Sequence, residues 1–159
     1  MTRYLKMSIA SLQLQDFQLL RVLVEANEPL ENIVYQDNFV ITVGFDILAS
    51  KDENYFKVPM KYKAVSRNKK TCRIKKIDIN ITGYFSIKEG TSEEEKRKLI
   101  PLCCISILYG IIRGLVINIT SSCPGGHVLL PALNFNDVLQ DHIKKLNEKQ
   151  NPSQQEKQS

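Results

Sequence analysis

Hydrophobic and polar positions alternate with a period of two over the first half of the chain and lose that period in the second half. Alternation of this kind is typical of strands that bury one face, and it covers residues 39–48, 56–64 and 72–87. Residues 12–25 are apolar on both phases, which predicts a strand covered on both sides. The pattern therefore predicts four antiparallel strands.

Two irregularities are expected within these strands. Pro59 lies on the outward phase of its run and cannot donate a ladder hydrogen bond, so it indicates an edge strand or a bulge. In the last run the apolar phase slips by one residue near Lys75 and Lys76. A bulge at that point would restore the register.

An apolar stretch from Leu99 to Ile119 follows the strands and predicts one long helix. Ser92, with Glu95 three residues later, has the pattern of a capping box, so the helix should begin near Ser92. About 20 apolar residues could also cross a membrane. Arg113 lies near the middle of the stretch, and a charge there is costly in a bilayer, so we expect a buried helix and no membrane span.

This helix is too apolar for one chain of 159 residues to cover. A second copy of the chain is therefore the expected partner, in a homo-oligomer. Gly110 and Gly114 stand four residues apart and would let another helix approach closely, although two tolerated glycines in a packed helix explain them equally well. We expect the interface between copies to contain Gly110, Arg113, Gly114 and Ile117.

The order of elements predicts an α+β fold, in which a four-stranded antiparallel sheet carries one long helix on one face and a short C-terminal helix follows. Residues 1–146 would form this single domain, and residues 147–159 a polar disordered tail. The amino end lacks an apolar leader core, so we expect the protein in the cytoplasm.

Candidate chemistry is sparse in this sequence. The four cysteines lack a C-x-x-C spacing and are expected to be core thiols: Cys72, Cys103, Cys104 and Cys123. Cys123 and His127 could supply two metal ligands, but structural zinc needs four, so no metal or other cofactor is expected. With two histidines and no nucleophile motif, the chain is not expected to be an enzyme.

Several segments of the chain resemble the SecB protein-export chaperone family. Ile107-Leu-Tyr109 with Arg113 is similar to that family's "ILFPYAR" helix, and Leu130-Pro131 with Asn134-Phe135 to its "LxxPxNF" segment, at equal spacing. Gly83-Tyr-Phe85 resembles the "GIF" that ends the last strand, and Asn54–Val58 resembles the "VYEV" strand start. The resemblance implies a tetrameric holdase, a chaperone that binds non-native chains without using nucleotide.

The resemblance also implies functional residues. A hydrophobic client groove would lie between the crossover after the first strand, the sheet edge and the short helix, and its candidates are Val34, Tyr35, Tyr55, Val128, Leu130, Phe135, Val138 and Leu139. Asp16 and Asp78 occupy two positions at which the family docks the translocation motor SecA. The net charge of +5 favours instead the family's other branch, whose members protect an antitoxin or another dedicated client.

The segment from residue 57 to residue 76 is strongly basic. It holds nine lysines and arginines and no acid, with Tyr55 and Tyr62 nearby for stacking on bases. The alternative function is therefore a nucleic-acid-binding module that uses this basic hairpin. The interpretation we favour is a solvated face of lysines that also protects an exposed sheet from edge pairing, and a contact with an acidic protein is a third.

Overall fold

The computed structural model describes residues 10–29, 31, 35 and 37–150, without the side chains of residues 142, 145, 146 and 148–150. The expected absence of a leader, the groove candidate Val34 and residues 151–159 of the expected tail lie outside this part of the chain.

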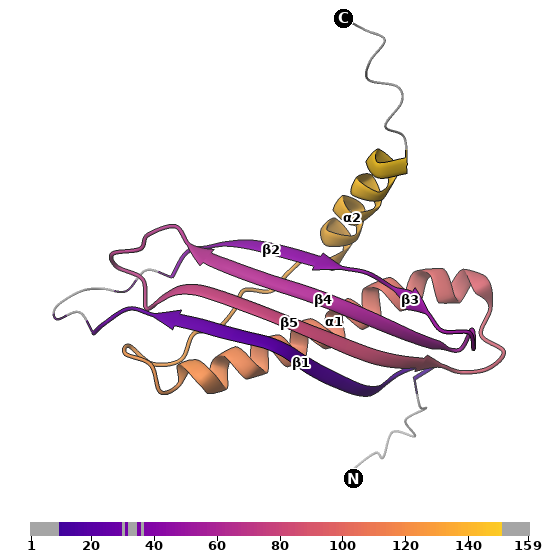
Figure 1. Ribbon diagram of the computed structural model, residues 1–159, viewed down its shortest axis with the longest axis horizontal. Helices are drawn as coiled ribbons and strands as arrows, with labels where there is room; N and C mark the ends of the chain where they lie inside the picture. The colour runs from indigo at the N-terminus through magenta and orange to yellow at the C-terminus, as the bar shows by residue number, and fades with distance from the viewer. Residues whose placement is uncertain (1–9, 30, 32–34, 36, 151–159) are drawn as a thin grey trace, which may run out of the picture.

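One antiparallel sheet forms the first layer of the molecule. Its strands are β1 (Leu12–Ala26), β2 (Phe39–Phe45), β3 (Leu48–Ala49), β4 (Tyr55–Ser66) and β5 (Ile74–Ile87). The strand order is β1-β5-β4-β2, and β3 pairs with β4 in line with β2 (Figure 1). Together, β2 and β3 are the single strand expected over residues 39–48, interrupted at Asp46 and Ile47.

Pro59 accounts for this interruption. Its carbonyl accepts a hydrogen bond from the amide of Asp46 at 3.1 Å, so the missing N–H of Pro59 faces the same side, toward the gap between β2 and β3. β4 itself is an inner strand, bounded by β5 on one side and by β2 and β3 on the other. The irregularity that Pro59 predicts therefore lies in the partner strand, not at an edge formed by β4.

The bulge expected near Lys75 and Lys76 is confirmed. Glu25 pairs with Lys76 and Ala26 with Ile74, which leaves Lys75 as the extra residue of β5. Two further bulges lie at Gln15 and Leu20 of β1. They mark the places where β1 is out of step with β5.

β1 is an edge strand, and the expectation that it is covered on both sides is wrong within one chain. Phe17 and Leu19 pair with the inward residues Gly83 and Ile81, so they lie on the helix side of the sheet. They are nevertheless 40% and 41% exposed, and Leu20 at the bulge is 68% exposed. An apolar strip of β1 is thus open to solvent or to another chain.

The helices follow the predicted order and confirm the α+β fold. α1 (Glu93–Thr120) begins where Ser92 accepts a hydrogen bond from the amide of Glu95 at 3.3 Å, as the capping pattern predicts. α2 (Phe135–Gln150) follows a loop, and the expected domain boundary at residue 146 falls inside it. α1 runs behind the sheet, and α2 projects away from it (Figure 1).

The core lies between α1 and the inner face of β4 and β5. Its fully buried side chains include Tyr62, Ala64, Ile77, Ile79, Ile105, Leu108, Ile112 and Val116. Gly83 permits the close packing, because a Cβ at that position would lie 2.8 Å from Cδ2 of Leu108. Tyr62, a stacking candidate in the basic segment, is therefore a core residue and not a surface ring.

Candidate functional site

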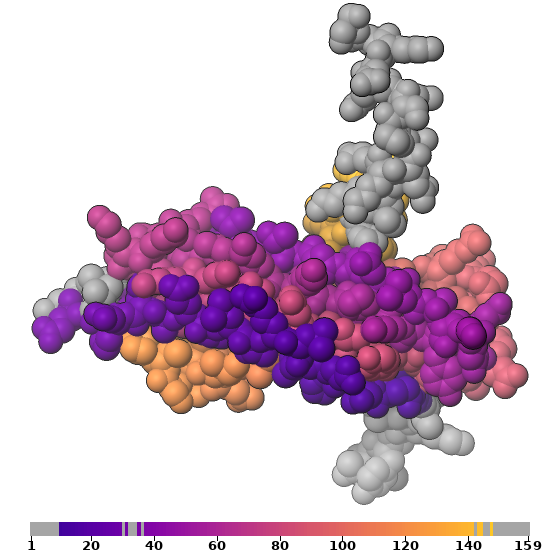
Figure 2. Space-filling model, viewed as in Figure 1, coloured from indigo at the N-terminus to yellow at the C-terminus, as the bar shows by residue number. Residues whose placement is uncertain are grey.

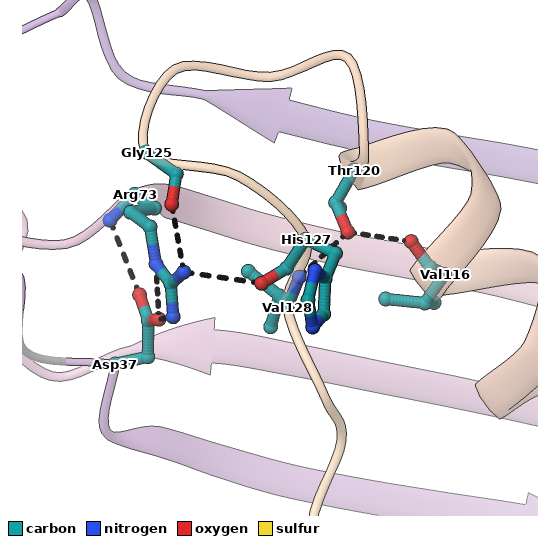
Figure 3. A network of polar contacts seen from close by, with 7 residues as sticks. All are labelled: Asp37, Arg73, Val116, Thr120, Gly125, His127 and Val128. Atoms are coloured by element: carbon teal, nitrogen blue, oxygen red, sulfur yellow. Dashed lines mark hydrogen bonds and ion pairs between the residues drawn. The ribbon is translucent and has the colours of Figure 1, made fainter.

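A clasp of polar contacts ties three distant segments together at one end of the sheet. Arg73, just before β5, contacts Asp37 of the crossover through both Nε and Nη2, and Nε lies 2.6 Å from Oδ2 (Figure 3). The amide of Arg73 also donates to Oδ1 of Asp37 at 3.2 Å. Nη1 of Arg73 donates to the carbonyls of Gly125 and His127, at 3.0 and 3.1 Å. One guanidinium thus links the crossover, the β4–β5 hairpin and the loop between the helices.

Two glycines of that loop allow it to make a tight turn. Gly125 and Gly126 have φ of +82° and +84°, which other residues rarely adopt. A Cβ on Gly125 would lie 2.6 Å from Cδ of Arg73 and 3.0 Å from a ring carbon of Tyr35. Gly125 is therefore required by the clasp itself.

Thr120, the last residue of α1, holds the next part of the loop. Its hydroxyl donates to the carbonyl of Val116 at 2.7 Å and accepts from the amide of Val128 at 2.8 Å (Figure 3). Val128 and Leu130 then enter the core, 1% and 0% exposed. In this structure these two groove candidates are closed off from any client.

The remaining groove candidates do not lie together. Tyr35 is beside the clasp, near the end of β4. Tyr55 is the first residue of β4, and the strand is about 36 Å long at the rise of an extended chain, so the two tyrosines lie at opposite ends of the sheet. Phe135 packs edge-on against Tyr109 of α1, with ring centroids 5.6 Å apart. Val138 and Leu139 are half-buried on α2. The candidates thus belong to three different parts of the surface.

Two cavities adjoin β3 instead, and the sequence patterns did not indicate them. One, of about 480 Å³, lies toward the start of α1 and is lined by Ile47, Ala49, Glu53, Phe56, Glu93, Lys96, Arg97, Ile100 and Pro101. The other, of about 490 Å³, has Leu48, Tyr55, Lys57 and Tyr84 among its lining residues. The break between β2 and β3, opposite Pro59, places Ile47 at the first cavity. Pro59 was therefore the sequence feature that could have indicated this cavity.

The two acidic candidates on the outer face of the sheet differ in their surroundings. Asp78 is flanked by Arg21 and Lys76, each 3.5 Å from its Oδ2. Asp16 is exposed and accepts a hydrogen bond from the amide of Phe17 at 2.8 Å. Neither stands within an acidic patch.

The expected interface residues of α1 lie on a side that the sheet does not cover. Gly110 and Gly114 are exposed, and a Cβ on either would meet nothing within 4 Å. Ile117 and Arg113 are half-buried, and Nε of Arg113 is buried without a hydrogen-bond partner among the described residues. α1 is long and apolar enough to cross a membrane, and 39% of its most apolar window is buried in the chain. Its packing against the sheet is that of a core helix.

The candidate metal and thiol chemistry rests on the cysteines and histidines in the part of the chain described. No group of three potential metal ligands gathers there, and all four cysteines are free thiols. Cys72 and Cys104 are buried, and Cys103 and Cys123 are half-buried. Burial raises the pKa of the Cys104 thiol to about 12, with neighbouring Cys103 adding to the rise, so Cys104 is an unreactive thiol.

Two core tyrosines predict a loss of stability in alkali. Burial raises the pKa of both Tyr62 and Tyr109 above the ordinary value near 10. Above pH 10 the unfolded chain releases these protons while the folded chain keeps them, so the free energy of unfolding should fall by about 1.4 kcal/mol per pH unit for each fully retained proton. Tyr62→Phe should reduce this slope by one proton, measured by urea unfolding between pH 9 and pH 11. An unchanged slope would contradict the prediction.

Comparison with known proteins supports the fold. No protein-family model and no curated protein matches the sequence. Among solved structures, a SecB-like chaperone of Mycobacterium tuberculosis, in complex with a peptide from an antitoxin, matches with a TM-score of 0.52 and 18% identity, over 78% of this chain and 91% of that one. A protein of unknown function from Streptococcus agalactiae matches with a TM-score of 0.43 and 17% identity, over 79% of this chain and 100% of that one. The chain therefore has a SecB-like fold.

Proposed function

We propose that this protein is a SecB-like chaperone, a non-enzymatic holdase of the cytoplasm that binds non-native polypeptide segments. The observation that carries the proposal is the open cavity of about 480 Å³ between β3 and the start of α1, on a SecB-like fold. Its floor is apolar and consists of Ile47, Phe56, Ile100 and Pro101. Such a surface binds branched or aromatic side chains without reading a defined sequence.

The surroundings of the cavity suit an extended client. Charged side chains of both signs form its rim: Glu53, Glu93, Lys96 and Arg97. β3 pairs with β4 alone among the described residues, so its other edge is free to pair with an added strand. A client strand there would turn alternate side chains toward α1 and this cavity. Backbone pairing supplies affinity that does not depend on client sequence.

The client is proposed to be a dedicated one, such as an antitoxin, ahead of exported proteins delivered to SecA. The neighbour from M. tuberculosis was solved with an antitoxin peptide, which supports this choice by analogy of fold. The outer face offers SecA little acidic surface, because Asp78 is flanked by two cations and paired with Lys63, and Lys61 and Lys57 face outward further along β4.

An aggregation assay tests the proposal. The protein should suppress light scattering by a chemically denatured apolar protein, and Ile47→Asn should lower the affinity for that client about fivefold, because half of an isoleucine's burial is worth roughly 1 kcal/mol. The matched control is Val40→Asn, an equally branched apolar residue on the outer face of β2, 49% exposed and away from the cavity.

The possible outcomes test the cavity as the client site and the chaperone activity separately. Full protection by both variants would remove the cavity as the client site. Failure of the unmodified protein to protect at any stoichiometry would overturn the chaperone proposal itself.

A further inference from the structure

Three lysines form a row along the outer face of β4. Lys57, Lys61 and Lys63 point away from α1, on the phase opposite the buried Val58, Met60 and Tyr62. All three are exposed, and none forms an ion pair with another described residue. At the rise of a strand, Lys61 lies about 7 Å from Lys63 and about 13 Å from Lys57.

The residues beside the row leave its charge largely uncompensated. On β2, Gly44 is paired with Lys61 and Thr42 with Lys63. On β5, Asn80 is paired with Lys61, while Asp78, paired with Lys63, already contacts Arg21 and Lys76. Like charges this close repel one another, and Asp78 is the one carboxylate paired with any of these three lysines among the described strands.

Protection of a sheet edge does not explain the row. Lysines serve that purpose on edge strands, whose N–H and C=O groups are unpaired. β4 is an inner strand, paired on both sides over most of its length. Edge protection therefore does not account for these three residues, although they face solvent as the favoured interpretation expects, and a ligand of opposite charge would give the row a role.

An aromatic cavity lies at one end of the row. This cavity, of about 490 Å³, is lined by Lys57 together with Tyr55, Tyr84 and Gln15. Tyr55 is 50% exposed, and the hydroxyl of Tyr84 donates to Oε1 of Gln18 at 3.2 Å, which fixes its ring on the outer face. Figure 2 shows this face of the sheet uncovered by either helix.

We propose that the outer face of the sheet binds single-stranded nucleic acid. The lysine row would contact successive phosphates, and a base would stack on Tyr84 or Tyr55 within the cavity. A flat sheet with exposed aromatic rings is a recurring platform for unstacked bases. An acidic protein would satisfy the lysines but would leave Tyr55 and Tyr84 without a role. This activity is separate from client holding, which uses the other side of β3.

Fluorescence anisotropy with a labelled 20-nucleotide oligothymidylate and an oligouridylate tests the proposal. Three phosphate contacts on a single strand predict a slope near −2 for log K against log salt, so affinity should fall about 20-fold between 50 and 200 mM salt. Replacing all three residues, Lys57→Gln, Lys61→Gln and Lys63→Gln, should remove most of the binding and most of that slope. Client holding by this variant should be unchanged.

The matched control replaces three exposed lysines elsewhere, Lys88→Gln, Lys98→Gln and Lys144→Gln, with the same change in net charge. It should bind like the unmodified protein. Tyr84→Ala and Tyr55→Ala together should weaken binding at least about fivefold without changing the salt slope. The proposal would be overturned if the unmodified protein failed to bind either oligonucleotide at 50 mM salt, or if the control variant lost as much affinity as the triple lysine variant. It would be overturned in favour of an acidic protein if polyglutamate competed as well as nucleic acid and the tyrosine substitutions had no effect.

Discussion

Arg73→Ala should destabilise the protein by about 3 kcal/mol, the largest loss we expect from any substitution outside the apolar core. The side chain of Asp37 is 12% exposed, and the guanidinium of Arg73 faces it through two nitrogens. Removing the cation leaves a largely buried carboxylate without its counter-charge. Two carbonyls of the inter-helix loop lose their donor as well, but both contacts are exposed, so water replaces most of their contribution.

Urea unfolding measures this loss directly. Asp37→Ala should cost less, because the guanidinium it leaves behind is 25% exposed and still holds the loop carbonyls. The matched control is Lys75→Ala, which removes an exposed ion pair with Glu25 at 4.0 Å and should change stability by under about 0.5 kcal/mol. Equal effects of Arg73→Ala and Lys75→Ala would show that the clasp carries no stability.

The sequence predicted the fold well where one face of an element is buried. The period of two located the strands, the phase slip located the bulge at Lys75, and the capping pattern located the start of α1. Each signal is local, since it depends on residues within a few positions of one another. The bulge at Gln15 left the same kind of signal, since Leu14 and Phe17 lie on opposite phases, whereas the bulge at Leu20 falls in an apolar run in which a slip changes little.

The candidate site was predicted less well, because it depends on contacts between segments distant in the sequence. Val128 and Leu130 are as apolar as any groove residue, and only packing beneath the clasp shows them to be core. Arg73 appeared as one of nine basic residues, yet its partner Asp37 lies 36 positions away. Tyr62 and Tyr84 look equivalent in sequence, and strand phase decides that one is buried and the other faces outward.

Two aspartates on the open strip of β1, Phe17→Asp with Leu19→Asp, should dissociate the proposed oligomer. Both side chains face the helix side of the sheet and are about two-fifths exposed, and Val22 on the same side is 39% exposed. On α1, Gly110 and Gly114 are exposed as well, and Nε of Arg113 is a buried donor that a second chain could satisfy. We expect the association constant to fall more than a hundredfold, since central aromatic residues of interfaces often contribute 2 kcal/mol or more.

Light scattering coupled to size-exclusion chromatography, at micromolar concentrations, distinguishes the states. The unmodified protein should elute as an oligomer, a tetramer if it assembles as the SecB resemblance implies, and the double variant as a folded single chain with unchanged circular dichroism. Val40→Asp is the control, because Val40 is an exposed apolar residue on the opposite face of the sheet and should leave assembly intact. A well-folded single chain for the unmodified protein would contradict the expected oligomer.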